Sequence, residues 1–310
     1  MDANTSPSCD EPSGFCGIGR WAGTAEVFDG KGVFLGNATD NRHIRSQQDD
    51  GRIKIDLAFV GPLKFSGHYY IREENHHRYY QGPVNCGHGE AFSKNLVSSN
   101  NFWPVTGLTH RFFLMILPDG NTQLSLSLMS RGEELIYSIV SENQKVIGES
   151  AAIPGLVNGI SYDLQHDPNA GRQEVLLHKS GKWQGTFNCV DENLQDIGTK
   201  DFSETIVPDG GVICTRREGG YYGIDSSQKA ITMVTNQRQS YTQEGHIMGS
   251  MSLYGGRASA GTLHFMKDGL RLWRREVINN EGNQKAVIEM WFKGSQRVGA
   301  QFGALTFEPN

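Results

Sequence analysis

The chain has 310 residues, a formal net charge of -5 and 37% hydrophobic residues. Apolar residues recur along the whole chain, which excludes a disordered protein, and the lack of a long basic run argues against nucleic-acid binding. The length suits two domains of about 150 residues each. An excess of glycine, 38 residues in all, is typical of a protein with many strands and tight turns.

The first 13 residues are polar, contain two prolines and are typical of a flexible lead. They lack the charged and apolar regions of a signal peptide, and no apolar stretch approaches about 18 residues, so we expect a cytoplasmic protein outside the membrane. The five cysteines include no Cys-x-x-Cys pattern, which argues against a disulfide scaffold and a structural zinc site. Cys9 and Cys16 can close a small loop if oxidised, but two reduced thiols are the favoured interpretation.

Strand patterns dominate the rest of the chain. From Arg52 to Phe59 apolar and polar residues alternate, as in a half-buried strand. No segment keeps the apolar rhythm of a helix over three turns, so the sequence predicts an all-β protein with short helices at most. Turn signals separate the alternating runs at Asp29-Gly30, Asp50-Gly51, Asp119-Gly120 and Asp209-Gly210.

An internal repeat divides the chain. The pattern GRWAGT at residues 19–24 recurs as GKWQGT at residues 181–186, 162 residues later. An aspartate follows each tryptophan after eight residues, at Asp29 and Asp191, where a hairpin turn is expected. A duplication at domain spacing follows from this repeat. We predict two domains, residues 14–155 and 156–310.

A second internal match predicts an insertion in the first half. Residues 126–135 align without a gap to residues 263–272, with methionine, glycine and the flanking leucines in common. On this alignment the first half is 25 residues longer between its tryptophan and its methionine. We place the excess at residues 81–108 as a long loop, which is usually functional in a compact domain. Its apolar Phe102 and Trp103 suggest a lid over a pocket.

The Gly-x-Trp pattern at the entry to the first strand of each half resembles the lipocalin or calycin superfamily. The resemblance implies two tandem lipocalin-like antiparallel barrels packed together, in which Trp21 and Trp183 close one end. The other end of such a barrel opens into an apolar ligand pocket. Ala25 leaves space in the first half where Phe187 fills it in the second, so we expect the first barrel to hold the ligand.

Residues 68–80 gather polar and aromatic side chains that are suited to acid–base chemistry. Histidine or glutamate moves a proton, and tyrosine or arginine holds a developing oxyanion. The alternative is that half of these residues face solvent, because neighbours on a strand point to opposite sides. The predicted catalytic residues are His68, Tyr70, Glu73, Arg78, Tyr80 and His110. The predicted ligand-binding residues are Phe102, Trp103, Arg111 and Phe112.

A metal site built from His76, His77, His88 and His110 is not favoured, because adjacent His76 and His77 would point to opposite faces of a strand. We expect no metal and no cofactor. Tandem barrels of this size resemble cofactor-free cyclases and isomerases of specialised metabolism, and also pigment or small-molecule binding proteins. The resemblance therefore implies a cofactor-independent cyclase or isomerase with a small hydrophobic or aromatic substrate. The alternatives are a non-catalytic carrier and an interaction module with filled barrels; the oligomeric state stays open.

Overall fold

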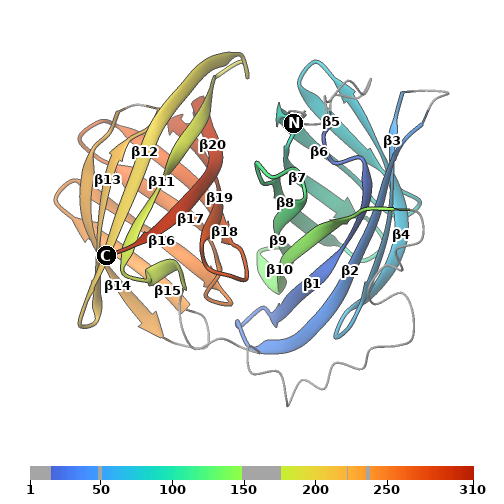
Figure 1. Cartoon of the computed structure of the whole chain (residues 1–310), viewed down its shortest axis with the longest axis horizontal. Coiled ribbons are helices and arrows are strands. Elements are labelled where there is room, and N and C mark those ends of the chain that lie inside the picture. Colours follow the sequence, from blue (N-terminus) through green and yellow to red (C-terminus); the bar gives the residue numbers. More distant parts are fainter. Residues whose placement is uncertain (1–14, 48–50, 149–175, 222, 235–237) are drawn as a thin grey trace, which may run out of the picture.

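The computed structural model describes residues 15–47, 51–148, 176–221, 223–234 and 238–310, which form two closed barrels (Figure 1). The first barrel contains β1 (Gly19–Asp29), β2 (Phe34–Ser46), β3 (Ile53–Val60), β4 (Lys64–Glu74), β5 (His77–Gln81), β6 (Cys86–Ser93), β7 (Leu96–Trp103), β8 (Leu108–Ile116), β9 (Thr122–Arg131) and β10 (Glu134–Val146). After the 3-10 turn η1 (Leu176–His178), the second contains β11 (Gly181–Asp191), β12 (Asp196–Asp209), β13 (Val212–Gly219), β14 (Ser226–Val234), β15 (Arg238–Glu244), β16 (Ile247–Tyr254), β17 (Ala258–Phe265), β18 (Leu270–Ile278), β19 (Gln284–Lys293) and β20 (Gln296–Pro309).

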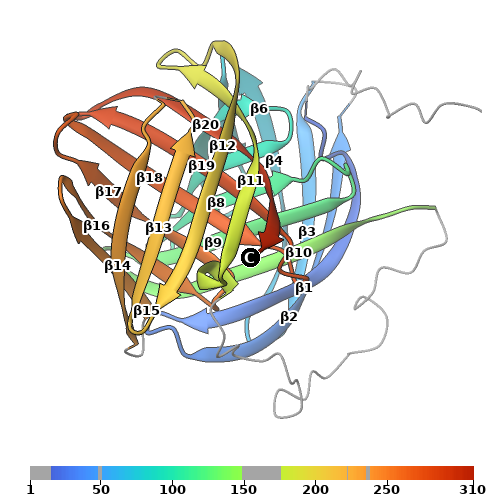
Figure 2. The ribbon, with the colours of Figure 1, turned by 60° about the vertical axis from the view of Figure 1, so that its left-hand side comes forward.

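Each barrel is an antiparallel meander in which every strand pairs with the next, and its first strand closes on its last (Figure 2). The prediction of an all-β protein with two barrels is confirmed. Lipocalin barrels typically have about eight strands. The described residues form ten strands in each barrel, so the resemblance holds for a duplicated antiparallel barrel and not for the strand number of lipocalins. No helix among the described residues is long and apolar enough to cross a membrane. The predicted boundary between residues 155 and 156, the N-terminal lead and Cys9 lie outside the described residues.

The two halves of the repeat occupy equivalent places. Trp21 and Trp183 are both fully buried, each near the start of the first strand of its barrel. Asp29 ends β1 and its carboxylate accepts two backbone N–H groups of the following turn, both at 2.8 Å. Asp191 ends β11 and accepts the matching two N–H groups at 2.9 and 2.8 Å. The aspartate therefore closes the same hairpin in both halves, at the place the repeat predicts.

The predicted insertion is wrong. Residues 81–108 contain β6 and β7, which are wall strands of the first barrel, so no lid is formed by this stretch. The last hairpin of each barrel turns at a glycine with positive φ, Gly132 and Gly294. Gly132 lies 111 residues after Trp21, and Gly294 lies 111 residues after Trp183. The two barrels thus have the same length between these landmarks.

The error came from the hairpins themselves. Residues 126–135 span the β9–β10 hairpin, while residues 263–272 span the β17–β18 hairpin, two strands earlier in its barrel. Hairpins of a meander share alternating apolar residues and a turn glycine, so any two of them align locally. The pairing register, which a sequence comparison does not contain, identifies the true equivalents.

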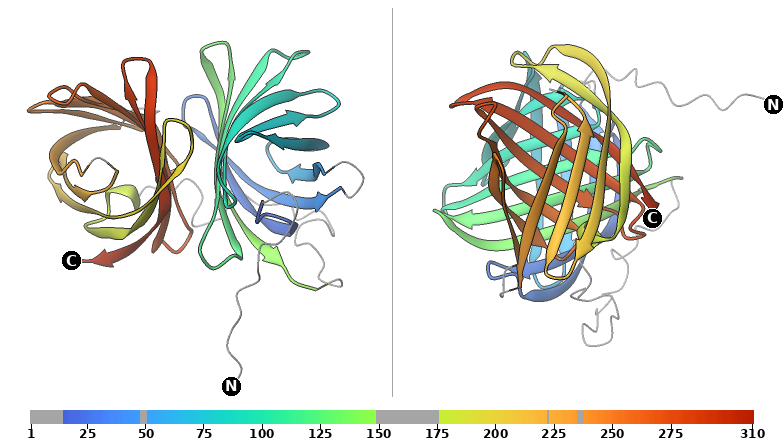
Figure 3. Two further views of the ribbon diagram at one scale, coloured as in Figure 1. Left: turned by 90° about the horizontal axis from the view of Figure 1, so that it is seen from above. Right: turned by 90° about the vertical axis from the view of Figure 1, so that its left-hand side faces the viewer.

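An apolar seam joins the two barrels. One hydrophobic cluster includes Phe113 and Leu126 from the first barrel and Ile288 and Phe302 from the second, all buried. The ribbons of β8 and β9 lie beside those of β18 and β19 between the barrels (Figure 3). An ion pair between Arg257 and Glu26, at 3.1 Å, also crosses the seam.

Candidate functional site

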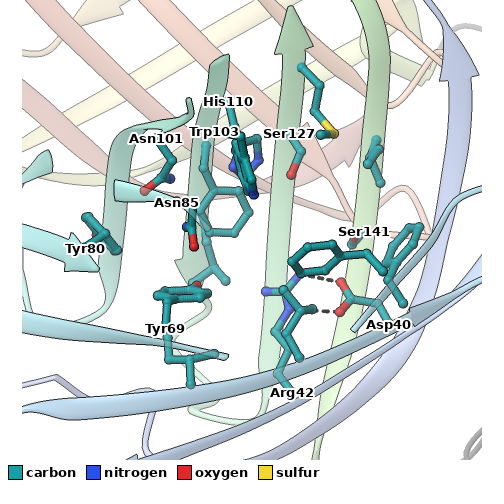
Figure 4. Close-up of a pocket in the computed structure, with 18 of the residues that line it drawn as sticks. Asp40, Arg42, Tyr69, Tyr80, Asn85, Asn101, Trp103, His110, Ser127 and Ser141 are labelled. Carbon is teal, nitrogen blue, oxygen red and sulfur yellow. Dashed lines mark hydrogen bonds and ion pairs between the residues drawn. The ribbon is translucent and has the colours of Figure 1, made fainter. Parts of the chain in front are cut away.

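A cavity of about 410 Å³ lies inside the first barrel. Its volume falls within the range of about 300–1,000 Å³ that is typical of small-molecule sites. Side chains from β2, β3, β4, β5, β7, β8, β9 and β10 line it, and most of them are apolar. Polar side chains reach it from several sides (Figure 4): Asp40, Arg42, Tyr69, Tyr80, Asn85, Asn101, His110, Ser127 and Ser141.

The two ends of the barrel differ. At one end Trp21 packs in an apolar cluster with Phe15 and Ile53, and its indole Nε1 donates to the carbonyl of Gly17 at 2.8 Å. At the other end the turns between paired strands supply lining residues, including Val84, which is 54% exposed. The cavity is therefore closed at the tryptophan end, and its lining reaches the surface at the opposite end.

An ion pair is buried in the cavity wall. Arg42 and Asp40 lie two residues apart on β2, so both point inward. The guanidinium donates from Nε to Asp40 Oδ1 at 3.0 Å and from Nη2 to the other carboxylate oxygen. It also donates to Gln123 at 3.3 Å and to Ser125 at 3.2 Å. Arg42 is consequently both neutralised and held in place by its neighbours.

His110 lies between two aromatic rings of the cavity, 5.7 Å from Trp103 and 5.4 Å from Phe112 between ring centroids. Burial, with smaller contributions from the charges of Arg275 and Arg42, lowers the pKa of His110 to about 4. The imidazole is therefore neutral near pH 7. Its Nδ1 atom is buried and has no hydrogen-bond partner among the described residues.

The second barrel supports this part of the site from outside. Arg275 on β18 donates from Nη1 to the backbone carbonyl of Phe112 on β8, at 3.3 Å. Its guanidinium lies over the Trp273 ring, 4.1 Å from the centroid. Burial and the nearby Arg111 lower the pKa of Arg275 to about 9. A cation of one barrel thus acts on the histidine inside the other.

Two tyrosines face the cavity from β4 and β5, with ring centroids 6.0 Å apart. Burial raises the pKa of Tyr69 to about 12, and burial also raises the pKa of Tyr80 above its ordinary value. Both phenols are therefore protonated near pH 7 and can donate hydrogen bonds.

The structure brings four of the predicted site residues into the cavity: Tyr80, Trp103, His110 and Phe112. The others lie elsewhere. His68 and Tyr70 alternate on β4 with the lining residue Tyr69 and so stand on the opposite face. For the same reason Phe102 and Arg111 point away from the cavity, next to Trp103 and Phe112.

Arg78 and Glu73, two of the predicted catalytic residues, contact each other outside the cavity. Arg78 is buried, donates from Nε to Glu73 at 3.0 Å, and donates from its Nη atoms to the carbonyls of Leu96 at 2.5 Å and Ser93 at 3.0 Å. Neither residue lines the cavity. The arginine instead satisfies backbone carbonyls where β6 turns into β7.

Several lining residues escaped the sequence analysis, in particular Asp40, Arg42, Asn101, Ser127 and Ser141. On β9 the leucines point outward into the seam between the barrels, so the serines between them point inward. An alternating strand does not itself reveal which face is the interior. The Asp-x-Arg spacing on β2 was the one available signal.

The interior of the second barrel is filled with ionic and aromatic side chains. Glu204 accepts two bonds from Arg274, both at 2.8 Å, and one from Lys285 at 2.8 Å. Arg217 donates from Nη2 to both carboxylate oxygens of Glu289, at 2.6 and 2.7 Å. The buried network contains three acids and three bases: Glu204, Glu276, Glu289, Arg217, Arg274 and Lys285.

Within the described ranges, no group of three or more His, Cys, Asp and Glu side chains is arranged to hold a metal ion. His110, one of the four histidines considered and not favoured as a metal site, has aromatic rings as its near neighbours.

Comparison with known proteins gives a fold without a function. No family model matches the chain, and no curated protein matches it. It is similar to a protein of unknown function of the DUF3598 family from Nostoc punctiforme, with 11% identity, 98% of this chain and 100% of that chain covered, and a TM-score of 0.58. The two chains share a fold.

Two further solved structures give weaker matches. A putative outer membrane protein from Bacteroides fragilis has 7% identity, covers 94% of this chain and 97% of its own, and has a TM-score of 0.25. Kievitone hydratase from Nectria haematococca has 8% identity, covers 97% and 93%, and has a TM-score of 0.19. Scores of this size support no structural argument.

Proposed function

We propose that the first barrel binds a neutral, largely apolar small molecule and cyclises or isomerises it. The observation that carries the proposal is the hollow interior of this barrel, closed at the tryptophan end, with polar groups set into an apolar wall. Space and inward polar groups together are what a small-molecule site requires.

The charged groups inside the cavity favour a neutral ligand, since the other lining cation, Lys64, is exposed at the open end of the barrel. Arg42 already donates to Asp40, Gln123 and Ser125, so it has no strong interaction left for an anion. Asp40 would repel a carboxylate or a phosphate. A positively charged ligand would have to compete with Arg42 for the same carboxylate. In contrast, the tyrosines, amides and imidazole of the wall can form hydrogen bonds with neutral polar groups of a ligand.

The pKa values of the site decide how it would act. A histidine whose pKa is about 4 is a weak base. Efficient general bases have a pKa near the working pH, so His110 is poorly suited to that role near pH 7. His110 is suited to hydrogen bonding with a substrate oxygen, and Tyr69 and Tyr80 donate as neutral phenols. The wall would hold the substrate folded and polarise it. A cyclisation or isomerisation within one molecule balances without a co-reactant.

A carrier is the second candidate. The apolar character of most of the wall favours it, because a carrier of apolar molecules needs few polar groups inside. A carrier releases its ligand unchanged, whereas an isomerase converts it into a product of identical mass. A change in retention time at constant mass therefore separates the two functions.

The test is incubation of the purified protein with fractionated cell extract, followed by mass spectrometry. An isomerase consumes one compound while a second compound of equal mass and different retention time accumulates. Ser127→Phe, which fills the cavity, should abolish the conversion, and Ser127→Ala, which keeps the space, should preserve it. A compound that is retained in stoichiometric amount and recovered unchanged would establish the carrier and refute the catalytic proposal.

A further inference from the structure

One row of residues crosses four neighbouring strands of the first barrel. Tyr80 on β5 pairs with Gly87 on β6, Gly87 pairs with Asn101 on β7, and Asn101 pairs with His110 on β8. Residues paired in this way lie side by side across neighbouring strands and point to the same face of the sheet. The three side chains of this row line the cavity, with Asn101 between the other two (Figure 4).

Two of these side chains present an unsatisfied polar atom. Asn101 Oδ1 and His110 Nδ1 are buried and have no hydrogen-bond partner among the described residues, whereas the Tyr80 hydroxyl interacts with Ser99. A buried polar group without a partner costs about 1–3 kcal/mol. Two such atoms on paired inward positions indicate that something other than the protein completes their hydrogen bonds.

Gly87 makes room for this arrangement. A Cβ atom at position 87 would lie 2.2 Å from Asn101 Oδ1 and 2.5 Å from the carbonyl of Asn100. Any side chain there would therefore displace the Asn101 amide. The glycine keeps the amide oxygen in the middle of the row.

The second barrel shows that the fold itself does not require polar groups here. Its equivalent row runs from Thr242 through Gly249 to Leu263 and Leu272. Leucines stand at the two positions that Asn101 and His110 occupy in the first barrel. Since Leu263 and Leu272 are buried in an apolar cluster, the same wall is stable without the amide and the imidazole.

We infer that the ligand of the first barrel carries a hydroxyl group, a phenol or an enol, whose single proton is shared between Asn101 Oδ1 and His110 Nδ1 in a three-centre hydrogen bond. This inference rests on the proposed function only in that a small molecule occupies the cavity. The amide oxygen of Asn101 can only accept, and Asn101 Nδ2 already donates to Ser99 Oγ at 3.2 Å. The neutral imidazole accepts at Nδ1 when its proton is on Nε2. Tyr80 can donate to a further ligand oxygen.

The test uses two probes that differ in one donor, 2-naphthol and its methyl ether, 2-methoxynaphthalene. We expect the wild-type protein to bind 2-naphthol about tenfold more tightly by calorimetry, the value of one good hydrogen bond. Asn101→Leu and His110→Leu import the residues of the second barrel and should reduce this preference to about twofold or less. Tyr70→Phe, a change on the outer face of β4, should leave the preference unchanged.

The outcomes separate this inference from the proposed function. If both probes bind the wild type with equal affinity, the hydroxyl inference is wrong while the cavity remains a binding site. If neither probe binds, both proposals fail. Melting curves of the leucine variants check that they fold, and Asn101→Asp, which keeps the acceptor, should retain the preference for 2-naphthol if the acceptor is what matters.

Discussion

The two barrels have the same strand order and equivalent pairing, but the side chains inside them differ. Arg42 is the cross-strand partner of Trp21, and Glu204 is the cross-strand partner of Trp183, so one barrel position carries opposite charges in the two halves. Around Glu204 a network of ion pairs fills the second barrel. Around Arg42 a single neutralised pair borders a cavity. The barrel wall therefore specifies the fold, and its inward side chains are free to diverge.

The positions that open the cavity can be identified one by one through the pairing. Ser127 in the first barrel corresponds to Glu289 in the second, and Phe112 corresponds to Arg274. In the second barrel Glu289 and Arg274 both belong to the network of ion pairs, and Arg274 Nη1 lies 3.2 Å from Glu289 Oε1. The smaller serine leaves the space that the glutamate and its partners occupy.

The largest effect we expect is common to both barrels. Trp21→Ala and Trp183→Ala should each lower the free energy of unfolding by about 3–5 kcal/mol, the typical cost of truncating a buried tryptophan. Both side chains are fully buried near the start of the first strand of their barrel. Urea unfolding of the two variants provides the measurement. A loss below about 1 kcal/mol in either variant would show that the tryptophan does not support its barrel in the same way.

The next effect is specific to the second barrel. Arg274 and Lys285 hold the pKa of Glu204 well below its usual range, so the carboxylate is charged and compensated. Glu204→Gln leaves these two cations partly uncompensated, and we expect a loss of about 3 kcal/mol in urea unfolding. Glu218→Gln, which disrupts an exposed pair with Arg216, is the control and should cost less than about 1 kcal/mol. Equal losses in the two variants would contradict the structural role of the network.

A third prediction concerns acid and is specific to the first barrel. His110 has a pKa of about 4 in the folded protein, below the unfolded value, so the unfolded chain binds the proton first as the pH falls. Stability from this residue is therefore complete above about pH 6.5 and lost towards pH 4, by at most about 3 kcal/mol. His110→Leu should lose correspondingly less stability than the wild type between pH 7 and 4. Parallel losses in the two proteins would show that the buried imidazole is not responsible.

The sequence predicted the strands that form the barrel walls better than the residues that line the cavity. The tryptophan repeat and the aspartate turns identified two β-rich halves because these residues act locally, at a strand start and a hairpin. Of the predicted site, Tyr80, Trp103, His110 and Phe112 line the cavity. The run of aromatic residues on β4 was assigned to the wrong face, because His68 and Tyr70 flank Tyr69 and the sequence does not show which of them points inward.

The remaining site residues were missed because the sequence does not show what covers the outer face of each barrel. On β9, Leu124 and Leu126 are buried in the seam against the other barrel, so the apolar face is not the interior. A sequence pattern records which residues are apolar but not which partner covers them. The supposed insertion failed for a related reason, since local similarity between hairpins carries no information on strand order.

The smallest effect tests the comparison most directly. Ser127→Met places an apolar side chain, similar in length to Glu289, where the first barrel is hollow. The described structure shows no hydrogen bond that Ser127 would lose, and added apolar burial offsets small strains, so stability should change by less than about 1 kcal/mol. Binding of 2-methoxynaphthalene, which needs space rather than hydrogen bonds, should weaken by about tenfold or more. The reverse change in the second barrel, Glu289→Ser, removes the carboxylate that accepts from Arg217 and should cost about 3–5 kcal/mol without creating a stable site. If Ser127→Met instead destabilised the protein as strongly as Glu289→Ser, the interior of the first barrel would be as closely packed as that of the second, and the cavity would have no role in binding.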